Sequence, residues 1–200
     1  TGLYLTTAFL SERSALDMIE HSAVTITGLL EKAVSEPMAQ GDDEGTRVIF
    51  ADLGREYPEI DLYMIDFRGE ITYTTIEGAE RLDMGQVLDG DREVLGSLLE
   101  KGLVTVSREG VLTTLEGKPS YVEVSTIENG PRCFHCHGKS RQILGAMVSV
   151  HDVSLDFAAL SDNQFDIALV SLFGLLILVL TLLLFMRKAV VLRVKSIARV

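Results

Sequence analysis

The two cysteines of this 200-residue chain lie in a single five-residue motif, Cys133-Phe134-His135-Cys136-His137. The order Cys-x-x-Cys-His suits covalent attachment of a c-type haem, because each thiol can add to one vinyl group of the porphyrin and the histidine that follows can ligate the iron. We therefore expect one covalent haem c, bound through Cys133 and Cys136, with His137 as the proximal iron ligand.

Other interpretations of the motif are less favoured. A structural zinc site would pack four ligands into five residues, which strains a tetrahedral shell, and no second ligand pair follows at finger-like spacing. A redox Cys-x-x-Cys normally opens a helix after a strand, whereas here Gly130 and Pro131 precede the motif and Gly138 follows it, which predicts a loop. A disulfide and a chance match also remain open.

A second informative segment is apolar. Residues 167–186 contain no charged side chain over 20 positions, which is the length that a helix needs to cross the hydrocarbon core of a bilayer. A buried core helix is the weaker alternative, because such helices are rarely apolar on every side. We predict a transmembrane helix.

Charge distribution predicts the orientation. Residues 1–166 hold all 29 acidic residues and 13 of the 18 Lys and Arg residues, a net charge of −16, whereas residues 187–200 hold the other five basic residues and no acid. Positive flanks stay in the cytoplasm, so the large domain is expected in the bacterial periplasm, where covalent haem is installed, with the chain anchored in the inner membrane. An acidic surface also argues against nucleic-acid binding. The sequence contains no phosphate loop, Gly-x-Ser-x-Gly or His-Glu-x-x-His motif, so we do not expect an enzyme.

Two helices are predicted first along the chain. Apolar residues recur at helical spacing over residues 3–36, which predicts a long amphipathic helix ending before Pro37. Its apolar start favours continuation from an upstream membrane helix. A polar loop follows at residues 40–45. Thr46 is then expected to cap a shorter helix that Pro58 stops.

The next part of the chain has the patterns of an antiparallel sheet. Residues 62–67 and 71–75 predict a hairpin with its turn at Arg68-Gly69, and residues 91–100 predict a helix. Further strands are expected at 104–106, at 111–115 after a turn at Glu109-Gly110, at 121–127 and at 143–150, with a helix at 154–166 leading to the membrane. The expected fold is α+β, a PAS/Cache-like antiparallel sheet with a long N-terminal helix and one transmembrane helix. The expected segments are residues 1–36, 37–166, 167–186 and 187–200.

The periplasmic stretch resembles the haem c-containing PAS-like sensor domains of bacterial transmembrane signalling proteins. The resemblance rests on MIDFRGEITYTT at residues 64–75, CFHCHG at 133–138 and ILGAMVSVHDVS at 143–154, ahead of a membrane span. It implies thioether bonds at Cys133 and Cys136, ligation by His137, and a homodimer. The basic segment 187–200 resembles the start of a HAMP helix, although the proline usual there is missing; a simple positive-inside anchor is the equal alternative.

The sixth iron ligand is not fixed by the sequence. Methionine, histidine or an open position would each favour a different redox or gas-binding behaviour. We favour Met38, which follows the predicted end of the first helix. The full set of candidates is Met18, His21, Met38, Met64, Met84, Met147 and His151.

Three functions follow from these observations. The first is a membrane-anchored haem c sensor that detects redox state or a small gas and signals to a cytoplasmic output module. The second is a membrane-anchored monohaem cytochrome subunit that transfers electrons to a redox partner protein. The third is a haem-free sensor that binds a small molecule.

Overall fold

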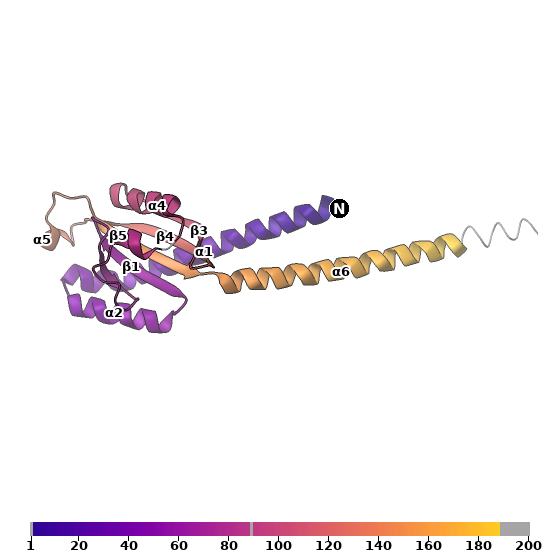
Figure 1. Ribbon diagram of the computed structural model, residues 1–200, viewed down its shortest axis with the longest axis horizontal. Helices are drawn as coiled ribbons and strands as arrows, with labels where there is room; N and C mark the ends of the chain where they lie inside the picture. Colours follow the sequence, from indigo (N-terminus) through magenta and orange to yellow (C-terminus); the bar gives the residue numbers. More distant parts are fainter. Residues whose placement is uncertain (1, 89, 189–200) are drawn as a thin grey trace, which may run out of the picture. The chain divides into compact units, whose positions relative to one another are not determined.

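Five antiparallel strands form one sheet in the computed structural model, which describes the backbone of residues 2–88 and 90–188 and the side chains of residues 16–88, 90–158 and 168–188. The strand order is β2-β1-β5-β4-β3, with β5 in the centre (Figure 1). The α+β, PAS/Cache-like architecture expected from the sequence is confirmed. The strands are β1 (Ile60–Asp66), β2 (Ile71–Thr74), β3 (Arg108–Leu115), β4 (Lys118–Glu128) and β5 (Ile143–Asp152).

Helices cover both faces of the sheet (Figure 1). On one face, α1 (Gly2–Gln40) and α2 (Asp43–Glu56) pack against β1 and β5, and Val34, Phe50 and Leu62 are at most 1% exposed there. On the other face lie α3 (Met84–Val87) and α4 (Arg92–Val104). Successive residues of a strand point to opposite faces, so each inner strand contributes to two separate apolar cores.

The helix ends differ in detail from the sequence prediction. The helix α1 continues through Pro37 to Gln40, because proline in the last turn lacks only one helical hydrogen bond. The N-cap of α2 is Asp42, whose carboxylate accepts a hydrogen bond from the Gly45 amide at 2.9 Å, and Thr46 lies inside the helix. The prediction of Thr46 as the cap was therefore wrong.

The turn predicted at Glu109-Gly110 was also wrong. Val104 ends α4, and β3 runs unbroken from Arg108, with Gly110 opposite Glu123 of β4. A Cβ atom at position 110 would lie 2.2 Å from the Tyr121 hydroxyl, so any other residue there would force the Tyr121 ring to move. The chain reverses instead at Glu116 and Gly117, with φ of 50° and 80°, as a two-residue hairpin turn requires.

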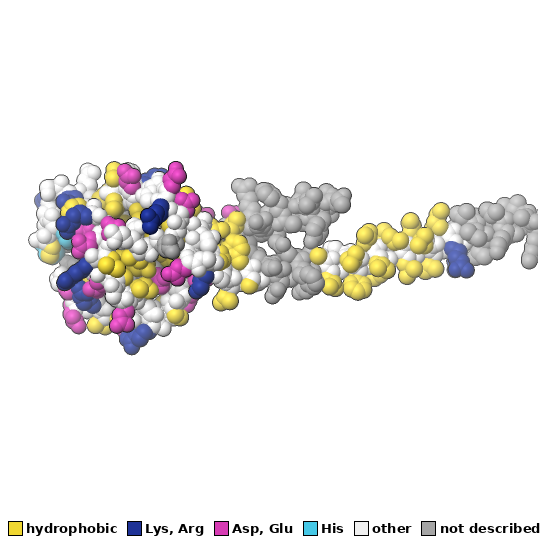
Figure 2. Space-filling model, in the orientation of Figure 1, with side chains coloured by type: hydrophobic (Ala, Val, Ile, Leu, Met, Phe, Trp, Pro, Cys, Tyr) yellow, Lys and Arg dark blue, Asp and Glu magenta, His cyan; other side chains and the backbone are white. Residues whose placement is uncertain are grey.

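A second compact unit comprises residues 158–200. The helix α6 (Ser154–Met186) continues into it and contains one segment, Ala168–Met186, that is long and apolar enough to cross a membrane. Figure 2 shows hydrophobic side chains along this segment. The predicted span, residues 167–186, lies within this helix. Residues 189–200, most of the predicted HAMP-like segment, are outside the described residues.

Candidate functional site

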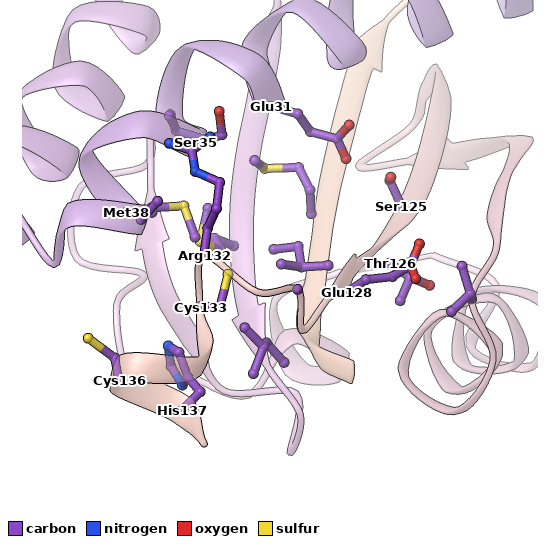
Figure 3. Close-up of a pocket in the computed structure, with 18 of the residues that line it drawn as sticks. Glu31, Ser35, Met38, Ser125, Thr126, Glu128, Arg132, Cys133, Cys136 and His137 are labelled. Atoms are coloured by element: carbon purple, nitrogen blue, oxygen red, sulfur yellow. The ribbon is translucent and has the colours of Figure 1, made fainter. Parts of the chain in front are cut away.

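A pocket of about 680 Å³ lies between the C-terminal half of α1, the sheet and the segment that carries both cysteines (Figure 3). Its volume is within the range of ligand and cofactor pockets, about 300–1,000 Å³. The pocket wall combines sulfur-containing, apolar and charged side chains. Those used below are Glu31, Met38, Met64, Arg108, Arg132, Cys133, Cys136, His137 and Met147.

The cysteine motif forms one helical turn, α5 (Phe134–His137), rather than the irregular loop expected from its flanking residues. The amide of His137 donates to the carbonyl of Cys133 at 3.0 Å, and the amide of Gly138 donates to that of Phe134 at 3.0 Å. Gly138 ends the turn with φ of 70°, a left-handed conformation that glycine adopts without steric cost. The turn fixes the backbone of both cysteines and of His137.

Asn129 joins the two ends of the cysteine segment, residues 130–141, and its contacts form the base of this segment. Its amide nitrogen Nδ2 donates to the carbonyls of Gly138 at 2.9 Å and Arg141 at 2.8 Å, and its backbone amide donates to the carbonyl of Gln142 at 2.8 Å. Sequence analysis missed this residue. The available signal was an asparagine immediately before Gly130-Pro131, a context in which Asn side chains often bond to nearby backbone.

Both thiols are free, with Cys133 half-buried and Cys136 exposed. Both residues line the pocket, and in Figure 3 their sulfur atoms point in different directions. A Cβ atom on Gly41, just after α1, would lie 3.9 Å from the Cys136 sulfur, so the end of α1 approaches the motif. Attachment of both sulfurs to one porphyrin therefore needs rotation of the Cys136 side chain, which its exposure permits.

The structure separates the seven candidate distal ligands. Met38, Met64 and Met147 line the same pocket as His137. A further cavity of about 300 Å³ is also lined by Met38, Met64 and His137. Met18 and His21 line a different surface depression on α1, and Met84 is buried on the opposite face of the sheet. The structure therefore brings three methionines together with His137.

His151 is held in a buried polar cluster rather than in the pocket. Its Nε2 atom lies 3.2 Å from the hydroxyl of Thr27 in α1 and 3.2 Å from that of Ser149, and the two hydroxyls are 2.8 Å apart. Burial lowers the pKa of His151 to about 4, because the charged imidazolium is disfavoured away from water, against a smaller opposing effect of Glu59. The cluster joins α1 to the centre of the sheet.

The charged side of the pocket centres on Arg108. Its Nε atom lies 2.9 Å from Oε1 of Glu123, a carboxylate on β4 that is 0% exposed, and its Nη2 atom bonds to Glu31 of α1. Burial raises the pKa of Glu123, which Arg108 and the nearby Thr27 hydroxyl oppose less strongly. A second arginine, Arg132, pairs with Glu36 of α1, and this pairing lowers the pKa of Glu36.

The donor set is compatible with haem c. Two free thiols, an exposed histidine on the same turn and a methionine-lined pocket are the groups that thioether attachment and axial ligation need. Among the described side chains, no three His, Cys, Asp or Glu residues converge in metal-binding geometry.

No protein-family model matches the sequence. Among solved structures, the sensor region of a sensor histidine kinase has 11% identity and a TM-score of 0.37, covering 47% of this chain and 39% of that one. A domain of an HTR-like protein from Haloarcula marismortui has 12% identity and a TM-score of 0.34, covering 48% and 98%. The sensor domain of the V. cholerae histidine kinase DctB has 14% identity and a TM-score of 0.40, covering 77% and 59%. Such low similarity assigns neither a family nor a ligand to this chain.

Proposed function

We propose that this chain is the membrane-anchored sensor domain of a bacterial signalling protein and carries one covalent haem c. Cys133 and Cys136 would form the thioether bonds, and His137 would be the proximal iron ligand. The observation that carries the proposal is that Cys136 and His137 lie in one helical turn, that Cys133 is the N-cap of this turn, and that all three line one pocket of about 680 Å³. When bound, the haem supplies an iron that changes oxidation state or takes a small gas as a ligand.

Met38 is the distal ligand that we propose. Unlike Met64 and Met147, which are 3% and 1% exposed within the apolar core, Met38 is only partly buried and lies in the last turn of α1. Release of Met38 would leave the last turn of α1 with one contact fewer. We propose that α1 and the segment after β5 carry this change toward a cytoplasmic output module.

The location and assembly belong to the same proposal. The domain would lie in the periplasm, with α6 in the inner membrane and the two residues that follow it, Arg187 and Lys188, facing the cytoplasm. The functional unit would be a homodimer, as the resemblance to haem c-containing PAS-like domains implies.

The first experiment tests haem attachment. The chain is exported to the bacterial periplasm together with haem-maturation machinery, and its intact mass and its oxidised, reduced and reduced-plus-CO spectra are recorded. We expect the mass of one haem, a Soret band, and a coordination change on reduction or CO binding. An intact mass equal to that of the chain without haem would refute the proposal. A six-coordinate spectrum unaffected by CO would favour the electron-transfer alternative.

The motif provides a matched pair of control variants. His137→Ala removes the proposed iron ligand, whereas His135→Ala removes a histidine two positions earlier on the same turn. We expect His137→Ala to change the spectrum of the attached haem and His135→Ala to leave it unchanged. Equal effects would contradict the assignment of His137.

A further inference from the structure

The two arginines that line the pocket are both paired with carboxylates of α1. Arg108 of β3 bonds to Glu31, and Arg132 of the cysteine segment bonds to Glu36. These two ion pairs, five residues apart on the helix, connect the C-terminal part of α1 to two different sides of the pocket. The pocket wall and the helix are therefore linked through groups that a ligand in the pocket can reach.

Arg108 is fixed independently of α1. The fully buried carboxylate of Glu123 lies 2.9 Å from its Nε atom, and within the described structure neither Glu123 oxygen has a hydrogen bond of normal geometry. A buried charge without its partner is strongly unfavourable, so Arg108 is kept at the pocket by Glu123. Glu31, which lies at the protein surface with a side chain 27% exposed, is then the partner that can exchange.

The last turns of α1 are the part of the helix that can respond. Leu30 and Val34 are anchored in the apolar core. Beyond them, Pro37 has no amide hydrogen to bond to the preceding turn, which leaves the Glu36–Arg132 pair as one of the contacts that hold this end. Loss of that pair therefore acts on a turn that already lacks one helical hydrogen bond.

One guanidinium group cannot neutralise several carboxylates at once. Arg108 already faces Glu31 and Glu123, and Glu20 of α1 also acts on Glu123 by charge. A further carboxylate that entered the pocket would have to replace a partner of Arg108 or add uncompensated negative charge. A planar, bidentate guanidinium is the side chain best suited to receive such a group.

We propose that Arg108 and Arg132 form the carboxylate-binding subsite of this pocket and that they exchange Glu31 and Glu36 for the two carboxylates of a bound dicarboxylate, here the propionates of haem c. This inference rests on the proposed function for the identity of the ligand. Its consequence is that filling the pocket disconnects the last turns of α1 from β3 and from the cysteine segment.

The test compares one substitution in two states of the protein. The 200-residue chain in lipid nanodiscs is prepared without haem and with covalently attached haem, and amide hydrogen exchange of residues 28–40 is measured for the wild type and for Glu31→Gln/Glu36→Gln. Without haem, we expect the double variant to exchange several-fold faster than the wild type, because the ion pairs are lost. With haem, we expect the two proteins to exchange equally, because the arginines no longer hold these carboxylates.

The wild type and the double variant are compared within the same haem state. Any effect of Met38 ligation on the exchange of α1 is therefore present in both proteins and cancels. Asp52→Asn, which removes the exposed Arg55–Asp52 pair of α2 outside the pocket, is the matched control and should not alter residues 28–40 in either state. An equal effect of the double variant in both states, or no effect without haem, would overturn the exchange. The intact mass distinguishes this failure from a failure of the proposed function. Protein that carries haem but shows no exchange overturns this inference alone, whereas protein that never acquires haem overturns both.

Discussion

Met64 of β1 and Met147 of β5 are directly opposite each other in the sheet, and both line the pocket that contains His137. Both are nearly fully buried and belong to the core formed with α1 and α2. Their position on two central strands leaves them little freedom to move. Met38, on the helix end above them, is the methionine whose position can change without disturbing the sheet.

The first prediction concerns these methionines. In haem-loaded protein, Met38→Leu should remove the sixth iron ligand and allow CO to bind the reduced iron readily, as recorded by absorbance spectra. Met64→Leu and Met147→Leu should keep the wild-type spectrum and change the free energy of unfolding by less than about 1.5 kcal/mol, as volume-conserving swaps do. Met84→Leu, on the opposite face of the sheet, is the control. An unchanged spectrum in Met38→Leu would exclude it as the ligand.

The second prediction is a pH dependence due to His151. Its pKa is about 4 in the folded chain and near 6.5 when unfolded, so between these values the unfolded chain binds more protons. The contribution of neutral His151 is therefore complete above about pH 6.5 and decreases toward pH 4, by about 2–3 kcal/mol at pH 4.5. Denaturation followed by tyrosine fluorescence at pH 7.5 and 4.5 should show a smaller loss for His151→Gln. An equal loss in the two proteins would refute this assignment.

The third prediction contrasts two glycines. A Cβ atom on Gly145 would lie 1.9 Å from the backbone carbonyl oxygen of Ile65, which cannot move without separating β1 from β5. Gly145→Ala should destabilise the fold by about 1–3 kcal/mol or more. Gly96 in α4 has open space at the same position, so Gly96→Ala should stabilise the fold by about 0.5–1 kcal/mol. Thermal unfolding measures both, and a neutral Gly145→Ala would show that the strands can separate at little cost.

The fourth prediction tests the closure of the cysteine segment. Asn129→Asp keeps the shape of the side chain but removes the Nδ2 donors to Gly138 and Arg141. We expect faster amide exchange throughout residues 130–141 and a stability loss of about 1–3 kcal/mol, from two hydrogen bonds at about 0.5–1.5 kcal/mol each. Asn129→Ala should have the same effect. A normal exchange rate in Asn129→Asp would show that the backbone bond to Gln142 is sufficient.

Strong local patterns predicted most of the fold. The hairpin of β1 and β2, the helix after Asp91 and the central strand β5 occur where the sequence indicated them. The errors lie where packing overrode a local signal. Gly110 suggested a turn, yet it lies inside a strand, where the Tyr121 side chain occupies the space of a Cβ atom.

The candidate site was predictable only in part. Cys133, Cys136 and His137 were identified as candidates from their spacing alone. The helical turn that holds them was not predicted, because the flanking glycines and proline indicated a loop. The pocket wall could not be predicted, because Arg108, Glu123 and Glu31 are far apart in the chain and meet only through the pairing of β3 with β4 and the packing of α1. Ion pairs between distant elements have no periodic signature in a sequence.

The base formed by Asn129 and Gln142 has a consequence for sequence variation. The backbone bond between these two residues lies next to the Glu128–Ile143 pair that ends the ladder of β4 and β5. Because that bond joins backbone atoms only, the side chains of residues 130–141 can vary without removing it. The part of the chain that carries the thiols can therefore diverge in sequence while the pairing of the two strands is kept.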